Sequence, residues 1–142
     1  MKESRLIGLD VGERRIGVAL SDPLGHTAQP YITIENDEGA IPRIGELVSE
    51  SGVGRVVVGL PLLLDGREGA QAARAREFAS RLGEHLSLPV EMIDERLTTR
   101  QATSVISRSE GAGRKDRGAT DRVAAALILQ SYLDGHGVGT DA

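Results

Sequence analysis

The chain has no cysteine and no tryptophan, and its aromatic residues are one phenylalanine and two tyrosines. The lack of cysteine excludes disulfides, thiolate zinc sites and a cysteine nucleophile. The three histidines, at positions 26, 85 and 136, stand too far apart to form a ligand-spaced pair. Metal chemistry in this chain would therefore have to use carboxylate oxygens, which suit Mg²⁺ or Mn²⁺ better than zinc. The scarcity of aromatics also argues against a platform on which nucleic acid bases stack.

Long hydrophobic runs are absent as well. No apolar stretch approaches the ~20 residues of a membrane span, and the first five residues lack the apolar core of a signal peptide. We therefore expect a cytoplasmic protein with no membrane partner. A chain of 142 residues is long enough for one domain with a real core. We expect that domain over residues 1–134, followed by a flexible tail over residues 135–142.

The charge of the chain is uneven, although its net value is only −4. Residues 96–122 hold seven basic and three acidic side chains, which gives this segment +4 and leaves −8 for the remainder. Such asymmetry favours an anionic partner, nucleic acid above all. A solvated surface helix and loop would show the same pattern, so charge alone leaves both interpretations open.

The hydrophobic pattern predicts a mixed α/β sheet. The short connection at Gly12 implies an antiparallel hairpin, and the continuous apolarity of residues 55–60 indicates a strand buried on both faces. Three meandering strands followed by βα units predict a five-stranded mixed sheet with helices on both faces. This arrangement is similar to the ribonuclease H-like fold, where the first strand is central. The expected strands are 5–11, 14–21, 28–34, 55–60 and 89–94, and the expected helices are 41–51, 69–85, 99–108 and 120–133.

Three carboxylates stand where these elements end or begin. Asp10 interrupts the first apolar strand near its carboxyl end, Glu95 directly follows the fifth strand, and Asp121 opens the last helix. Thr120 is the expected N-cap of that helix. Sites in open α/β sheets form at the carboxyl ends of central strands, so we expect the three side chains to converge there. Converging carboxylates repel one another, and a divalent cation relieves that repulsion.

Each acid also has a purely structural interpretation. Asp10 could organise the turn with Gly12, Glu95 could pair with a neighbouring arginine, and Asp121 could be a first-turn acid favoured by the helix dipole. Their joint placement favours the metal site. Two cations ~4 Å apart can activate water and stabilise the leaving oxygen of an in-line phosphodiester displacement.

Four motifs, in order, carry a family resemblance: "GLDVGERRIGVALSD", "VVVGLPLLLDG", "DERLTT" and "DRVAAALILQSYL". From about Leu6 to Leu133 the chain resembles the YqgF/RuvX family of RuvC-like nucleases, within the ribonuclease H-like superfamily. The resemblance implies a nuclease that helps to mature the 5′ end of pre-16S rRNA. It also implies that Asp10, Glu95 and Asp121 are the catalytic, metal-binding acids, with Mg²⁺ or Mn²⁺ as the cofactor.

The chain departs from the wider superfamily at one point. Many ribonuclease H-like enzymes take their second acid from strand four, but here that strand ends in Gly59-Leu60-Pro61 and no acid follows until Asp65. We expect Glu95 to reach inward from strand five, and we keep Asp65 as the alternative.

Basic residues near these motifs are the expected contacts of the nucleic acid backbone, because the planar fork of arginine suits phosphate. We expect recognition of shape or of a duplex–single-strand junction, with little reading of bases. The expected contacts are Arg14, Arg96, Arg114, Lys115 and Arg117.

Other functions remain open at this point. The chain could be a Holliday-junction or branched-DNA resolvase, a DNA exonuclease, or a nucleic-acid-binding module without catalysis. A small ATP-binding protein of the sugar-kinase and actin fold shares the Asp-x-Gly turn, but that architecture needs two such domains around a nucleotide. Monomer and homodimer are both open, since a resolvase would need a symmetric dimer to cut two strands.

Overall fold

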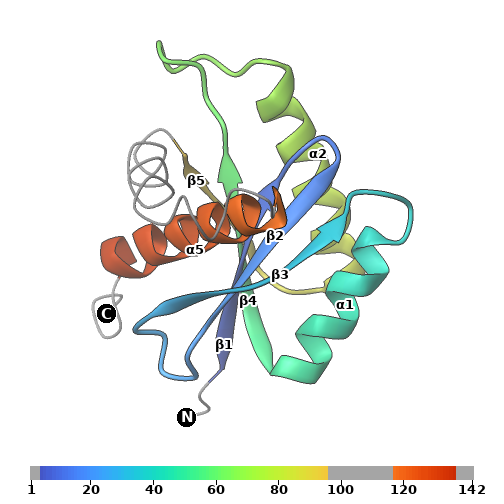
Figure 1. Ribbon diagram of the computed structural model, residues 1–142, viewed down its shortest axis with the longest axis vertical. Helices are drawn as coiled ribbons and strands as arrows, with labels where there is room; N and C mark the ends of the chain where they lie inside the picture. The colour runs from blue at the N-terminus through green and yellow to red at the C-terminus, as the bar shows by residue number, and fades with distance from the viewer. Residues whose placement is uncertain (1–3, 96–116, 137–142) are drawn as a thin grey trace.

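The computed structural model describes residues 4–95 and 117–136 (Figure 1). The expected helix over 99–108 lies outside the described residues, as do residues 137–142. The described elements, in chain order, are β1 (Arg5–Val11), β2 (Arg15–Ser21), β3 (Ala28–Glu35), α1 (Ala40–Ser51), β4 (Val53–Leu60), α2 (Ala70–Leu86), β5 (Val90–Asp94) and α5 (Arg117–His136).

The five strands form one mixed sheet in the order β3-β2-β1-β4-β5. The pairs β1–β2 and β2–β3 are antiparallel, whereas β1–β4 and β4–β5 are parallel. The predicted fold class and the central position of β1 are therefore confirmed. Because β1 is central, a side chain at its carboxyl end lies in the middle of that edge of the sheet.

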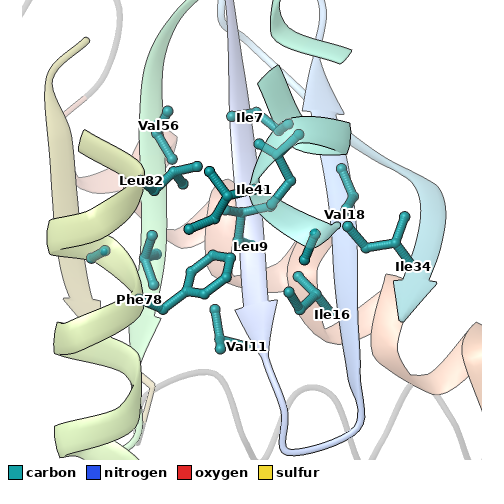
Figure 2. Close-up of a cluster of buried hydrophobic side chains, with 14 of the residues drawn as sticks. Ile7, Leu9, Val11, Ile16, Val18, Ile34, Ile41, Val56, Phe78 and Leu82 are labelled. Atoms are coloured by element: carbon teal, nitrogen blue, oxygen red, sulfur yellow. The ribbon is translucent and has the colours of Figure 1, made fainter. Parts of the chain in front are cut away.

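Helices cover both faces of the sheet, with α1 and α2 on one face and α5 on the other (Figure 1). Successive side chains of a strand point to opposite faces. Ile7 and Leu9 accordingly join Phe78 of α2 in the first core cluster (Figure 2). Gly8 lies on the α5 face, where an added Cβ would come within 2.7 Å of the Leu129 Cβ. The glycine thus lets α5 pack directly onto the sheet, and the alternation places Asp10 on this same face.

The start of α5 corrects one prediction. The helix begins at Arg117, so Thr120 is not its N-cap and Asp121 is its fifth residue. A tertiary contact explains the difference: the Thr33 hydroxyl on β3 donates a 2.7 Å hydrogen bond to the Gly118 carbonyl and fastens the first turn to the sheet. These two residues are 85 positions apart, so a capping pattern read from neighbouring residues could not predict their contact.

The other element boundaries agree with the sequence-based expectations to within about two residues, apart from the end of α5. That helix continues to His136 and so includes Gly135, which the sequence pattern assigns to the tail. Among the described residues, no helix is both long and apolar enough to cross a bilayer.

Candidate active site

Asp10 stands at the carboxyl end of β1, directly opposite Gly17 of β2. Its side chain is half-buried and forms no hydrogen bond or ion pair with the described residues. The turn that follows is closed without it, because the Gly12 N–H donates to the Arg15 carbonyl at 2.9 Å and the Asn36 amide donates to the Gly12 carbonyl at 2.7 Å. Asp10 is therefore not needed to organise this turn.

Glu95 lies beside Asp10 because Gly59 leaves space for it. The Glu95 N–H donates to the Leu60 carbonyl at 3.0 Å, which continues the β4–β5 pairing one residue beyond the strand. A Cβ on Gly59 would collide with the Glu95 carboxylate and would come within 2.7 Å of its Cγ. The side chain thus lies across the end of β4, as expected. Asp65, the alternative, pairs with Arg67 at 2.6 Å and does not line the pocket described below.

Asp121 reaches the same edge from α5. A Cβ on Gly17 would collide with the Asp121 carbonyl, so the helix backbone rests on this glycine. Since Gly17 is the cross-strand partner of Asp10, Asp121 stands next to Asp10. As the fifth residue of α5 it lies beyond the first turn, which rules out the helix-dipole interpretation. Its carboxylate accepts a 2.8 Å hydrogen bond from Arg15 Nε in an ion pair.

The three acids therefore follow one line across the sheet, which we call the acid row: Asp121 over β2, Asp10 on β1, and Glu95 over β4. The line is set by the register. Asp10 pairs with Gly17, and the pairing of Leu9 with Val58 brings the next residue of each strand, Asp10 and Gly59, side by side. The neighbours of Asp10 on the two adjacent strands are thus both glycines, and their missing side chains leave room for Asp121 and Glu95.

Burial and mutual repulsion disfavour the charged forms of two of these acids. Burial, with a further contribution from the Asp121 charge, raises the pKa of Asp10 to about 6. Burial raises the pKa of Glu95 to about 8, and the charges of Asp10 and Asp94 add to this shift. Ionising both groups therefore costs free energy in the folded protein. A bound cation would relieve that cost.

Asp10 and Glu95 line one pocket of about 140 Å³, which has room for several water molecules. Pocket size and an all-oxygen donor set suit a hydrated hard cation such as Mg²⁺ or Mn²⁺. Within the described ranges, however, no three potential ligands form a group that could hold an ion. Asp10 and Glu95 are placed to bind a cation without rearrangement. Asp121 is paired with Arg15 and would have to leave this arginine before it could bind the same cation. The other lining residues are Val11, Gly12, Glu13, Pro61, Gln71 and Arg74.

A larger, open depression of about 500 Å³ lies between α1 and α2. Its polar residues include Glu46 and His85, but it does not contain any acid of the row. We assign the site to the smaller pocket, because acids from separate elements meet there.

The expected nucleic acid contacts are only partly within the described chain. Arg14 is exposed at the β1–β2 turn and does not line the pocket. Arg117 begins α5, whereas the other three expected contacts, Arg96, Arg114 and Lys115, lie outside the described residues.

Sequence reasoning missed two arginines that contact the site. Arg15 shares a strand face with Gly17, two residues later, and this spacing could have identified it. Arg74 lies one helical turn after Gln71 on α2, and no motif distinguished it from the other arginines of that helix.

The chain matches known families over most of its length. The RuvX family, described as Holliday junction resolvase, matches residues 4–135. A relative from Pelotomaculum thermopropionicum is 47% identical over 136 residues, which cover 94% of this chain and 88% of the relative. A relative from Syntrophus aciditrophicus is 50% identical over 135 residues, which cover 92% and 88%. Both are named "Putative pre-16S rRNA nuclease".

Solved structures agree on the fold. RuvC of T. thermophilus, in complex with a Holliday junction substrate, aligns with a TM-score of 0.60 at 14% identity and covers 95% of this chain and 98% of its own. The fowlpox virus Holliday junction resolvase aligns with a TM-score of 0.57 at 10% identity, covering 92% and 98%. These likenesses confirm the ribonuclease H-like fold. The family match and the identities above establish that the chain belongs to the RuvX family.

Proposed function

We propose that this chain hydrolyses phosphodiester bonds of nucleic acid with the help of a divalent cation held by the acid row. The observation that carries the proposal is the pair Asp10 and Glu95. Both are carboxylates with raised pKa values, both line one pocket, and both stand at the carboxyl edge of the parallel strands. Nuclease is also the activity named for the curated relatives.

The chain's own residues would divide the work by position. When bound, Mg²⁺ or Mn²⁺ supplies Lewis-acid polarisation of the phosphate and an activated water. Asp10 and Glu95 would hold the cation from β1 and from the residue after β5. Asp121 would complete the set once its carboxylate leaves Arg15. The freed guanidinium would then lie beside the site, where its charge favours a phosphate.

The proposed substrate is the 5′ end of pre-16S rRNA, in the cytoplasm. This choice rests on relatives that are close in sequence and carry that name, whereas the RuvC likeness, at 14% identity, bears on the fold alone. The RuvX description keeps branched DNA as the second candidate. Arg14, Arg96, Arg114, Lys115 and Arg117 are retained as proposed backbone contacts.

A cleavage panel tests the proposal. End-labelled RNA with a 5′ leader joined to a duplex, single-stranded DNA and a four-way DNA junction are incubated with the protein in Mg²⁺, Mn²⁺ or EDTA. We expect cleavage of the RNA that needs the cation and falls at least about a hundredfold in Asp10→Asn. Asp37→Asn, an exposed acid paired with Arg43, is the matched control and should cleave normally.

Equal cleavage by Asp10→Asn and wild type would overturn the assignment of the site. Preferential cleavage of the four-way junction would move the function to branched DNA. The mass of the active species, measured by light scattering, separates the two further, because resolving a junction requires two sites.

A further inference from the structure

Arg74 is a cation in the wall of the acid pocket with no assigned role. It projects from α2, is half-buried, and lines the pocket together with Gln71. Asp10 and Glu95 line the same pocket from the sheet. The sheet therefore contributes two acids to the pocket, and α2 contributes a guanidinium.

Arg74 has no carboxylate partner among the described residues. It forms no ion pair there, although two carboxylates line its pocket. By contrast, five arginines hold ion pairs within the described ranges: Arg15, Arg43, Arg55, Arg67 and Arg76. The guanidinium thus stands back from the acids, with the pocket between them, and its donors remain available for an anion.

The helix that carries Arg74 is firmly placed. Ala72 and Ala75, on either side of it in the sequence, are fully buried. Arg76 pairs with Glu68 through two nitrogens, at 2.6 and 2.8 Å, and so ties α2 to the loop before it. Gln71 and Arg74, three residues apart, are neighbours on one side of the helix. Their donors are held at the pocket by a rigid element, which reduces the entropy lost on binding.

The ligand that fits these donors is a phosphate. Arginine presents a planar fork of N–H donors that matches phosphate oxygens, and the amide of Gln71 can donate beside it. Carboxylates on the facing wall repel an anion unless a cation lies between them. A phosphodiester could be held on one side by a cation bound to the acids and on the other side by the Arg74 guanidinium.

We propose that Arg74, with Gln71 beside it, binds a phosphate of the substrate strand across the pocket from Asp10 and Glu95. This inference rests on the proposed function and deepens it, because it assigns α2 as the second wall of the nuclease site. The strand would then lie over the pocket between the sheet edge and α2.

Binding without turnover tests the inference. Affinity of a fluorescein-labelled RNA with a 5′ leader and a duplex is measured by anisotropy for wild type, Arg74→Gln and Arg74→Lys. The buffer contains Ca²⁺, a hard cation that carboxylate oxygens bind, in place of Mg²⁺ or Mn²⁺. We expect Arg74→Gln to weaken binding about tenfold and to reduce the slope of log affinity against log salt by roughly one. Arg74→Lys should keep the salt slope and lose part of the affinity, since the charge remains and the fork is lost.

Arg81→Gln is the matched control, because Arg81 is an exposed arginine of the same helix. It should leave affinity nearly unchanged, and thermal unfolding should show that all variants are folded. Arg74→Gln and Arg81→Gln with the same affinity would overturn the inference, whether or not the wild type cleaves. Weaker binding by Arg74→Gln without any metal-dependent cleavage by wild type would support this phosphate contact and reject the proposed catalysis.

Discussion

Arg15 of β2 donates from Nε to the Asp121 carboxylate of α5 at 2.8 Å, and so joins two residues that are 106 positions apart. Asp121 is also an expected metal ligand. The guanidinium therefore occupies the carboxylate that a cation would need, and the two positive charges must compete for it. In the structure the ion pair with Arg15 holds Asp121, while Asp10 and Glu95 share the pocket.

Replacing Arg15 by Gln should strengthen cation binding. The substitution removes the competitor, and the freed Asp121 carboxylate adds a negative charge beside Asp10. We expect Mn²⁺ affinity, measured by calorimetry on the free protein, to rise several-fold. Asp121→Asn should lower it. Arg43→Gln breaks an exposed pair with Asp37, away from the acid row, and serves as the control. Equal Mn²⁺ affinity in wild type, Arg15→Gln and Asp121→Asn would mean that Asp121 is not a ligand.

Neutralising Asp10 should stabilise the cation-free protein at alkaline pH. The folded-state pKa is about 6 against an ordinary 3.8, so folding favours the protonated form. The stability that the protonated form provides is complete below about pH 3.8 and is lost as the pH rises through 6. In EDTA at pH 8, Asp10→Asn should therefore raise the free energy of unfolding by on the order of 1 to 3 kcal/mol. Urea denaturation measures the difference.

At pH 4 the same comparison should show almost no difference, because Asp10 is then largely protonated in the folded state. Asp37→Asn gives a control of opposite sign. Hydrogen bonding from Arg43 holds the pKa of Asp37 below its ordinary value, so its loss should destabilise the protein at pH 8. A lower stability of Asp10→Asn at pH 8 in EDTA would contradict the unfavourable burial of the ionised Asp10 carboxylate.

Stabilisation by divalent cations should grow with pH. Cations bind the ionised carboxylates, and the pKa values of Asp10 and Glu95 are raised to about 6 and about 8. The increase in melting temperature caused by Mn²⁺ should thus be small at pH 5 and larger at pH 8. The double variant Asp10→Asn, Glu95→Gln should show no such pH dependence. A similar shift in wild type and double variant would place the bound Mn²⁺ elsewhere.

The sequence predicted those features of the site that depend on short-range pattern. Asp10 interrupts an apolar strand, and Glu95 directly follows one; strand alternation and the rule for carboxyl edges then place both correctly. The antiparallel pairing of the first two strands followed from a short hairpin turn, and the burial of the fourth strand on both faces followed from its continuous apolarity. All of these inferences use residues that are close together in the sequence.

The features that were missed depend on contacts between distant segments. The early start of α5 requires Thr33 to hold Gly118, and the engagement of Asp121 requires β2 to bring Arg15 beneath that helix. Arg74 became notable only when α2 was found at the pocket wall. No local periodicity encodes which arginine of α2 lines the pocket.

Two glycines beside Asp10 should respond differently to an added methyl group. At Gly17 the Cβ meets the Asp121 carbonyl, which is helix backbone and cannot turn aside. Gly17→Ala should therefore displace α5 and cost about 1 to 3 kcal/mol of stability. At Gly59 the Cβ meets the side chains of Glu95 and Ile128, which can rotate. Gly59→Ala should fold with a smaller loss, yet move Glu95 out of the acid row.

The two effects are separated by measuring urea denaturation and Mn²⁺ affinity on the same samples. For Gly59→Ala we expect a clear loss of Mn²⁺ affinity with a nearly normal unfolding midpoint. Gly135→Ala, where an added Cβ meets nothing within 4 Å, is the control within α5 and should be neutral or slightly stabilising. If Gly59→Ala bound Mn²⁺ as wild type does, the space left by Gly59 would not be needed to place the Glu95 carboxylate at the metal site.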